Sequence, residues 1–230
     1  MSTNKNNPVF MTTRWSIVIS ATKDDSTSLE DLCRQYWQPV YAVARTSGHD
    51  IEMAKDLTQS FFAKLLEKSW LKAADQNKGR FRTFLITTLK RYLANEWHKE
   101  RALKREGSHA IIPLDEALTG SVSAAEARMG PDRLFDRRWA LVVLDSAMTR
   151  LKDESDETFS ALKETLTADR GEVDYQKIAD SLQTSEGSAR VAVHRFRKRY
   201  RALIRSEVAE TVSKDEEIEN ELEILLEALF

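Results

Sequence analysis

The residues best placed to do chemistry lie in the segment 188–205, SARVAVHRFRKRYRALIR, which holds seven Lys or Arg and no Asp or Glu. Such a density of cationic side chains neutralises phosphates, and polar groups in the first turns of a helix can reach base edges. A helix advances about 100° per residue, so its spacing defines one outer face. That face and its flank hold Ser188, Arg190, Val191, His194, Arg195 and Lys198. The segment therefore predicts a DNA-recognition helix.

The residues before this segment provide the elements that must position it. A short helix over 174–182 and a tight turn come first, with Asp174 and then Thr184 or Ser185 as capping side chains. In the basic helix, five apolar residues spaced four, three, four and three form an inner stripe: Ala189, Val193, Phe196, Tyr200 and Leu203. The combination is typical of a helix-turn-helix. The simpler alternative is a solvated basic helix on a surface.

Charge is strongly segregated although the net charge is only −2. Residues 78–105 hold nine Lys or Arg against two acids, and the chain from Glu207 onward holds nine acids against one Lys. Segregated charge creates strong local fields, which favour a polyanionic partner for the basic segments. The apolar stripe of the acidic tail could fold over a basic DNA-binding face or pack on the second domain.

Helical periodicity extends over most of the chain, and no convincing strand is predicted. Seven Gly and four Pro are few for 230 residues, which favours long helices. Pro39 is expected to kink or break a helix near Gln38. We predict an all-α protein of two small helical domains joined by a linker, the second with a helix-turn-helix. The predicted parts are an N-terminal extension (1–25), a first domain (26–106), a linker (107–135), a second domain (136–210) and an acidic tail (211–230).

Several classes of protein are disfavoured. The single cysteine, Cys33, and four scattered His predict no disulfide, no metal site and no cofactor. The N-terminus lacks an apolar leader, and the longest apolar run, at 139–144, is too short to cross a bilayer. No catalytic constellation is found. We expect a cytoplasmic protein that is not an enzyme and has no membrane partner.

Two motifs in order give the chain a resemblance to a known family. Residues 178–204, IADSLQTSEGSARVAVHRFRKRYRALI, resemble region 4 of extracytoplasmic-function (ECF) sigma factors of bacterial RNA polymerase, in the sigma-70 family. Residues 56–68, DLTQSFFAKLLEK, resemble the part of region 2 that binds polymerase. Residues 79–106 stand where region 2 reads the promoter. The resemblance covers most of the chain.

The resemblance implies partners and roles. Core RNA polymerase would be bound through its β′ clamp helices by Asp56 and Gln59, with Phe62 and Leu66 as apolar neighbours, and through its β flap. An anti-sigma factor is a further candidate partner. Region 4 would read the −35 element through the outer face of residues 188–198. Val191 and Ser60 depart from residues common in the family, which affects the sequence read at −35 and the clamp contact.

Region 2 of this family reads and melts the −10 element, which requires cations for the displaced strand and flat side chains for unstacked bases. The resemblance implies these roles for Arg80, Arg82, Lys90, Arg91, Trp97, Lys99 and Arg101. Trp97 is expected to be exposed, whereas Phe84 and Tyr92 are expected in the core. The predicted function is that of a sigma factor directing polymerase to promoters in transcription initiation. The alternative is a stand-alone helix-turn-helix regulator that binds DNA without polymerase.

Overall fold

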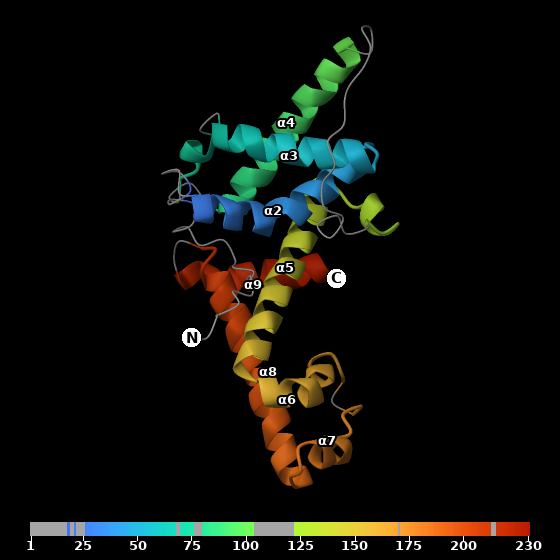
Figure 1. Ribbon diagram of the computed structural model, residues 1–230, viewed down its shortest axis with the longest axis vertical. Helices are drawn as coiled ribbons and strands as arrows, with labels where there is room; N and C mark the ends of the chain where they lie inside the picture. Colours follow the sequence, from blue (N-terminus) through green and yellow to red (C-terminus); the bar gives the residue numbers. More distant parts are fainter. Residues whose placement is uncertain are drawn as a thin grey trace, which may run out of the picture.

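The computed structural model describes Val18, Ala21 and residues 26–67, 70–75, 80–103, 122–169, 171–212 and 215–230. Every regular element within these ranges is helical, so the predicted all-α fold class is confirmed. Figure 1 shows an elongated molecule whose first helices lie at one end and whose α7 lies at the other. The described helices include none that is both long and apolar enough to cross a membrane.

The first half of the chain folds into three long helices and a short 3-10 turn. They are α2 (Ser26–Thr46), α3 (Ile51–Glu67), η1 (Trp70–Ala73) and α4 (Phe81–Leu103). Gly48, with φ of +95°, ends α2 in the left-handed region, and the Asp50 carboxylate accepts a 2.8 Å bond from the Met53 amide to begin α3. The last part of α4 projects beyond the other helices (Figure 1).

Pro39 lies inside α2, and the helix continues through it. Of the two predicted outcomes, the break near Gln38 is therefore wrong and the kink stays a prediction. Buried side chains on both sides of the proline, Tyr36 and Tyr41 among them, pack into the core of the protein. We attribute the continuity of the helix to this tertiary packing, which offsets the loss of one backbone hydrogen bond.

The second half contains three long helices and several short ones. They are η4 (Glu126–Arg128), α5 (Pro131–Glu154), α6 (Asp156–Leu162), η5 (Lys163–Leu166), α7 (Tyr175–Ser181), α8 (Glu186–Ala209), η6 (Asp215–Glu217) and α9 (Ile218–Leu229). Pro131 occupies the first turn of α5, where its missing N–H costs nothing. Helix α5 packs along α2, α8 and α9, so it connects the two ends of the molecule.

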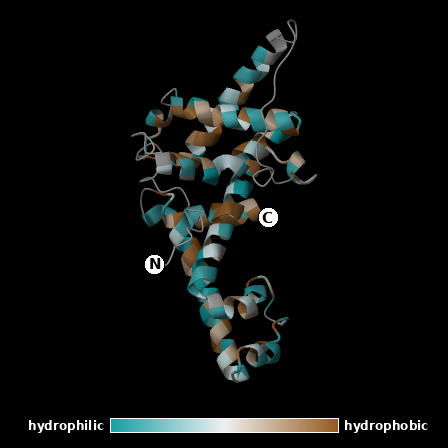
Figure 2. Ribbon diagram, viewed as in Figure 1, coloured by the Kyte–Doolittle hydropathy of each residue, from teal (hydrophilic) through white to brown (hydrophobic). Residues whose placement is uncertain are grey.

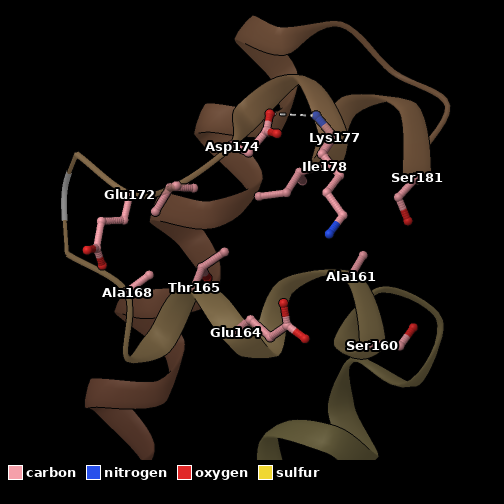
Figure 3. A pocket seen from close by; sticks show the side chains of 11 residues that line it. Ser160, Ala161, Glu164, Thr165, Ala168, Glu172, Asp174, Lys177, Ile178 and Ser181 are labelled. Carbon is pink, nitrogen blue, oxygen red and sulfur yellow. Dashed lines mark hydrogen bonds between the residues drawn. The ribbon is translucent and has the colours of Figure 1, made fainter.

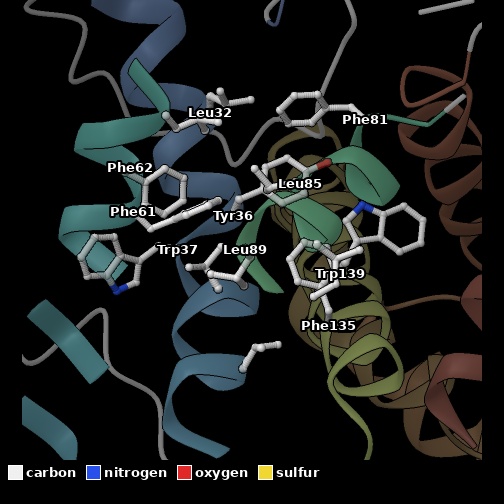
Figure 4. Packing of buried hydrophobic residues seen from close by; sticks show 14 of the residues in the cluster. Leu32, Tyr36, Trp37, Phe61, Phe62, Phe81, Leu85, Leu89, Phe135 and Trp139 are labelled. Atoms are coloured by element: carbon white, nitrogen blue, oxygen red, sulfur yellow. The ribbon is translucent and has the colours of Figure 1, made fainter. Parts of the chain in front are cut away.

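One hydrophobic cluster includes residues from both halves (Figure 4). Tyr36 of α2 lies edge-on to Phe81 of α4 at 5.5 Å and stacks at 6.0 Å on Phe135 of α5. Val208 of α8 and Leu225 of α9 belong to the same cluster. A smaller cluster lies between α5, α7 and α8. The predicted domain boundaries stay a prediction. The packing adds that the start of α5 contacts α2 and α4, and that the tail contacts α4.

Candidate nucleic-acid interface

Helices α7 and α8 begin at the capping side chains that the sequence predicted. The Asp174 carboxylate accepts a 3.0 Å bond from the Lys177 amide (Figure 3), and the Ser185 hydroxyl accepts a 3.2 Å bond from the Ser188 amide. In the turn, Gln183 takes a φ of +50°, and the Thr184 amide donates to the Ala179 carbonyl at 2.9 Å. These bonds fix the angle at which α8 leaves α7.

The inner stripe of α8 is buried against α5 and α7, as predicted. Four of its residues are at most 5% exposed: Ala189, Val193, Phe196 and Leu203. The fifth, Tyr200, is half-buried, and its hydroxyl donates to the Leu144 carbonyl at 3.3 Å. Ile178 and Ala179 of α7 face the same cluster. Because the inner stripe is held from two sides, the opposite face of α8 is held in a fixed orientation.

The outer face of α8 is exposed along its first three turns. Its residues are Ser188, Arg190, Val191, His194, Arg195 and Lys198, all exposed, with Val191 at 48%. Among the described residues we find no ion pair that involves His194, Arg195 or Lys198. The cations of Arg195 and Lys198 are therefore available to a phosphate, while Val191 offers an apolar contact of the kind that a thymine methyl group accepts.

Other cations of the same segment hold the fold together. Arg197 donates to the Thr165 carbonyl at 2.8 Å and to the Ala168 carbonyl at 2.9 Å. Arg199 forms a two-bond pair with Glu154 at 2.6 Å, and the hydrogen bond from Arg199 lowers the pKa of that carboxyl. Arg190 lies 4.2 Å from the ring centre of Tyr175 and contacts Glu186. The seven Lys and Arg residues of 188–205 thus divide into two groups. Available cations are open to a phosphate, and engaged cations contact other groups of the protein.

A pocket of about 360 Å³ beside α7 is a poor phosphate site (Figure 3). Its lining includes three carboxylates, those of Glu164, Glu172 and Asp174, against the single ammonium of Lys177. Excess negative charge repels a nucleic-acid backbone. We therefore place the candidate interface on α8 and not in this pocket.

The basic residues at the start of α4 are covered by carboxylates. Arg82 is 6% exposed, and its guanidinium contacts Asp136 of α5 and donates to Glu221 of α9 at 3.1 Å. Arg80 is half-buried, with its Nε 2.7 Å from the same Glu221 carboxylate. Burial raises the pKa of Asp136, which the neighbouring Arg82 only partly offsets. In this arrangement both arginines are bound by carboxylates of α5 or α9.

Two further predicted residues of α4, Lys90 and Arg91, are exposed. Lys90 pairs with Asp132 of α5 at 2.7 Å, an exposed contact that solvent screens strongly. Arg91 makes no hydrogen bond or ion pair that we find within the described residues.

The projecting end of α4 carries the exposed aromatic. Trp97 is 44% exposed, whereas Tyr92 is 3% exposed and Phe84 packs against the core, so all three expectations are confirmed. Glu96 contacts both Lys64 and Lys99 at 2.8 Å. Burial raises the pKa of Glu96, but these two ammonium groups outweigh it and the pKa falls below its usual value. The side chain of Arg101 lies outside the described residues.

The predicted polymerase-binding residues of α3 lie at different depths. Gln59 is exposed, and Asp56 and Leu66 are half-buried. Phe62 is 4% exposed and stacks on Trp37 at 6.0 Å, so it supports this face from within and presents little surface of its own. Their role in binding polymerase stays a prediction.

The sequence reading missed the carboxylates that cover α4. Asp132 and Asp136 lie at the start of α5, and Glu221 comes 139 positions after Arg82. The only sequence signal was the segregated acidic charge of the tail, which indicated a basic counterpart without saying which one.

Comparison with known proteins matches the first helices of the chain to a family. Residues 32–103, from α2 to the end of α4, match the family Sigma-70 region 2. The RNA polymerase sigma factor YlaC of Bacillus subtilis (strain 168) is 28% identical over 170 residues, which make up 74% of this chain and 88% of that protein. A search of solved structures found no match.

Proposed function

Because the chain is an ECF-type sigma factor of the sigma-70 family, we propose that it contacts promoter DNA at two places, with α8 at the −35 element and α4 at the −10 element. Its partners are core RNA polymerase and promoter DNA, and its function belongs to transcription initiation. The stand-alone regulator is not favoured, since residues 32–103 match region 2 of sigma factors. RNA synthesis is the work of the core enzyme, and we assign this chain no catalytic residue.

The observation that best supports the −35 contact is the exposed, capped start of α8. Ser188 lies in the first turn, where side chains reach base edges in a major groove, and Arg195 and Lys198 follow about two and three turns later. Each phosphate that a cation neutralises releases counterions, so binding should weaken steeply with salt. Arg197 and Arg199 act indirectly in this proposal, by holding α8 on η5 and α5.

The −10 contact is assigned to the projecting end of α4. Trp97 offers a flat surface on which an unstacked base could lie, and Arg91 and Lys99 are exposed on the same helix. Glu96 holds Lys99 in the free protein, so strand binding would compete with that ion pair. Arg80 and Arg82 would join this surface only if their carboxylate partners were displaced.

For polymerase we propose the exposed side of α3 as the contact with the β′ clamp helices, with Asp56 and Gln59 as its polar groups. The second half of the chain would contact the β flap, and an anti-sigma factor could compete for either surface. Replacing Asp56 and Gln59 together by alanine should weaken binding to core polymerase. Glu30→Ala, which removes an exposed carboxylate from α2, is the matched control.

The experiment that tests the whole proposal is transcription in vitro with purified core polymerase on a library of genomic fragments. We expect discrete start sites that appear only when this chain is present, together with a stable complex between chain and core. Core polymerase alone is the control. The proposal fails if no complex forms and no start site depends on the chain.

A further inference from the structure

The acidic C-terminal helix α9 lies against the basic start of α4. Glu221 is fully buried, and its carboxylate is within 3.1 Å of the guanidinium groups of both Arg80 and Arg82. Arg80 also donates to the side-chain oxygen of Asn220 at 2.5 Å. Two guanidinium groups that the sequence offers to DNA are therefore bound to one side chain of the same protein.

Helix α9 is held along its whole length. At its start, Glu219 pairs with Arg205 of α8. At its end, Arg137 of α5 donates to the Leu229 carbonyl at 2.5 Å, where a cation also complements the helix dipole. Ile218, the first residue of the helix, and Leu225 are buried in the cluster shared by both halves. Figure 1 shows α9 crossing α5 near the middle of the molecule, and Figure 2 shows its apolar residues there.

The contact uses the chemistry that promoter DNA would use. A carboxylate and a phosphate bind a guanidinium through the same N–H donors, so one group cannot serve both fully at once. A buried ion pair adds little net stability over well-packed apolar side chains, yet it discriminates strongly between partners of different charge. The carboxylate of Glu221 is thus a partner that another anion, such as a DNA phosphate, could replace at these guanidinium groups.

We propose that α9 is an internal competitor for DNA: Glu221 occupies Arg80 and Arg82 in the free protein, and α9 leaves them when the chain engages polymerase and promoter. This proposal rests on the proposed function of α4 at the −10 element. Asp132 and Asp136 of α5 contribute to the same cover, through Lys90 and Arg82. The free chain would therefore bind DNA without Arg80 and Arg82.

The direct test removes the carboxylate and keeps the shape. Glu221→Gln is compared with Glu223→Gln, which removes the same charge from an exposed position of the same helix. Both are made in the full chain carrying Arg195→Ala and Lys198→Ala, so that α8 contributes little binding. The probe is a fluorescent single-stranded DNA of mixed sequence. We expect Glu221→Gln to bind it about fivefold more tightly or better, a typical coupling between sites, and Glu223→Gln to change little.

Equal affinities for the two variants would overturn the proposal, because the gain would then reflect net charge alone. A second measurement remains informative if Glu221→Gln unfolds. Hydrogen exchange of the α9 amides in the wild-type chain should be slow when it is free and faster in the polymerase–promoter complex. Unchanged protection in that complex would also overturn the proposal. Failure of the proposed function itself is distinguished by transcription with the wild-type chain. Start sites that depend on the chain support the proposed function, whatever the two measurements on α9 show.

Discussion

The two cationic segments look alike in the sequence and differ in the folded protein. On α8, His194, Arg195 and Lys198 are exposed, and we find no ion pair that involves them among the described residues. On α4, Arg80 and Arg82 are bound to Glu221, and Lys90 to Asp132. A count of cations in a sequence therefore overestimates the charge available to a partner. The difference arises from segments 42 to 139 residues away in the chain, which bring the carboxylates of Asp132, Asp136 and Glu221 to α4.

The largest effect should come from the packing that covers α4. Phe135 is fully buried and stacks on Tyr36, so Phe135→Ala should lower the free energy of unfolding by about 3–5 kcal/mol. Leu141→Ala, at a position that is 41% exposed, is the control and should change it by under about 1 kcal/mol. Urea unfolding followed by circular dichroism measures both. A small loss for Phe135→Ala would mean that α5 contributes little to the cover.

The next largest effect is expected at the exposed cations of α8. Replacing Arg195 and Lys198 together by alanine should weaken duplex promoter binding by the polymerase complex about 10- to 100-fold and flatten its salt dependence by about two counterions. Arg199→Ala removes a cation that is paired with Glu154, and it should leave the salt dependence almost unchanged. Titrations at two or more salt concentrations measure both quantities. Equal slopes for the two variants would remove the distinction between available and engaged cations.

A smaller effect is expected at the exposed aromatic of α4. Trp97→Ala should weaken strand opening by about 1–3 kcal/mol, the usual contribution of one base stacked on an aromatic ring. Trp97→Phe keeps a ring and should retain much of the opening. The permanganate reactivity of unpaired thymines near the start site measures this strand opening. Full opening by Trp97→Ala would assign strand capture to other residues of α4.

The smallest effect concerns Glu96, which partly covers Lys99. Because its pKa is lowered in the folded protein, the carboxylate stabilises the fold above its ordinary pKa of 4.5, and this stability is lost as pH falls through the lowered value. Wild type should exceed Glu96→Gln in stability by about 1 kcal/mol or less near neutral pH, and the gap should close in acid. Urea unfolding at both pH values checks the sign. A gap that widens in acid would contradict the ion pairs of Glu96.

Local features were predictable from the sequence because they depend on near neighbours. The caps at Asp174 and Ser185, the inner stripe of α8 and the exposure of Trp97 all follow from spacing within one or two turns. The continuity of α2 through Pro39 and the burial of Phe62 were not predictable, since both depend on packing between helices. The same limit applies to Arg82, whose type and position indicate a surface cation until its distant carboxylate partners are known.

Helix α5 has a consequence for the geometry of the two DNA-facing surfaces. Val143 belongs to the larger cluster and Ala147, one turn later, to the smaller one, so a single continuous helix enters both. One extra residue inserted between them would rotate the smaller cluster by about 100° and move it by about 1.5 Å. The length of α5 therefore sets the relative orientation of the outer face of α8 and the tip of α4.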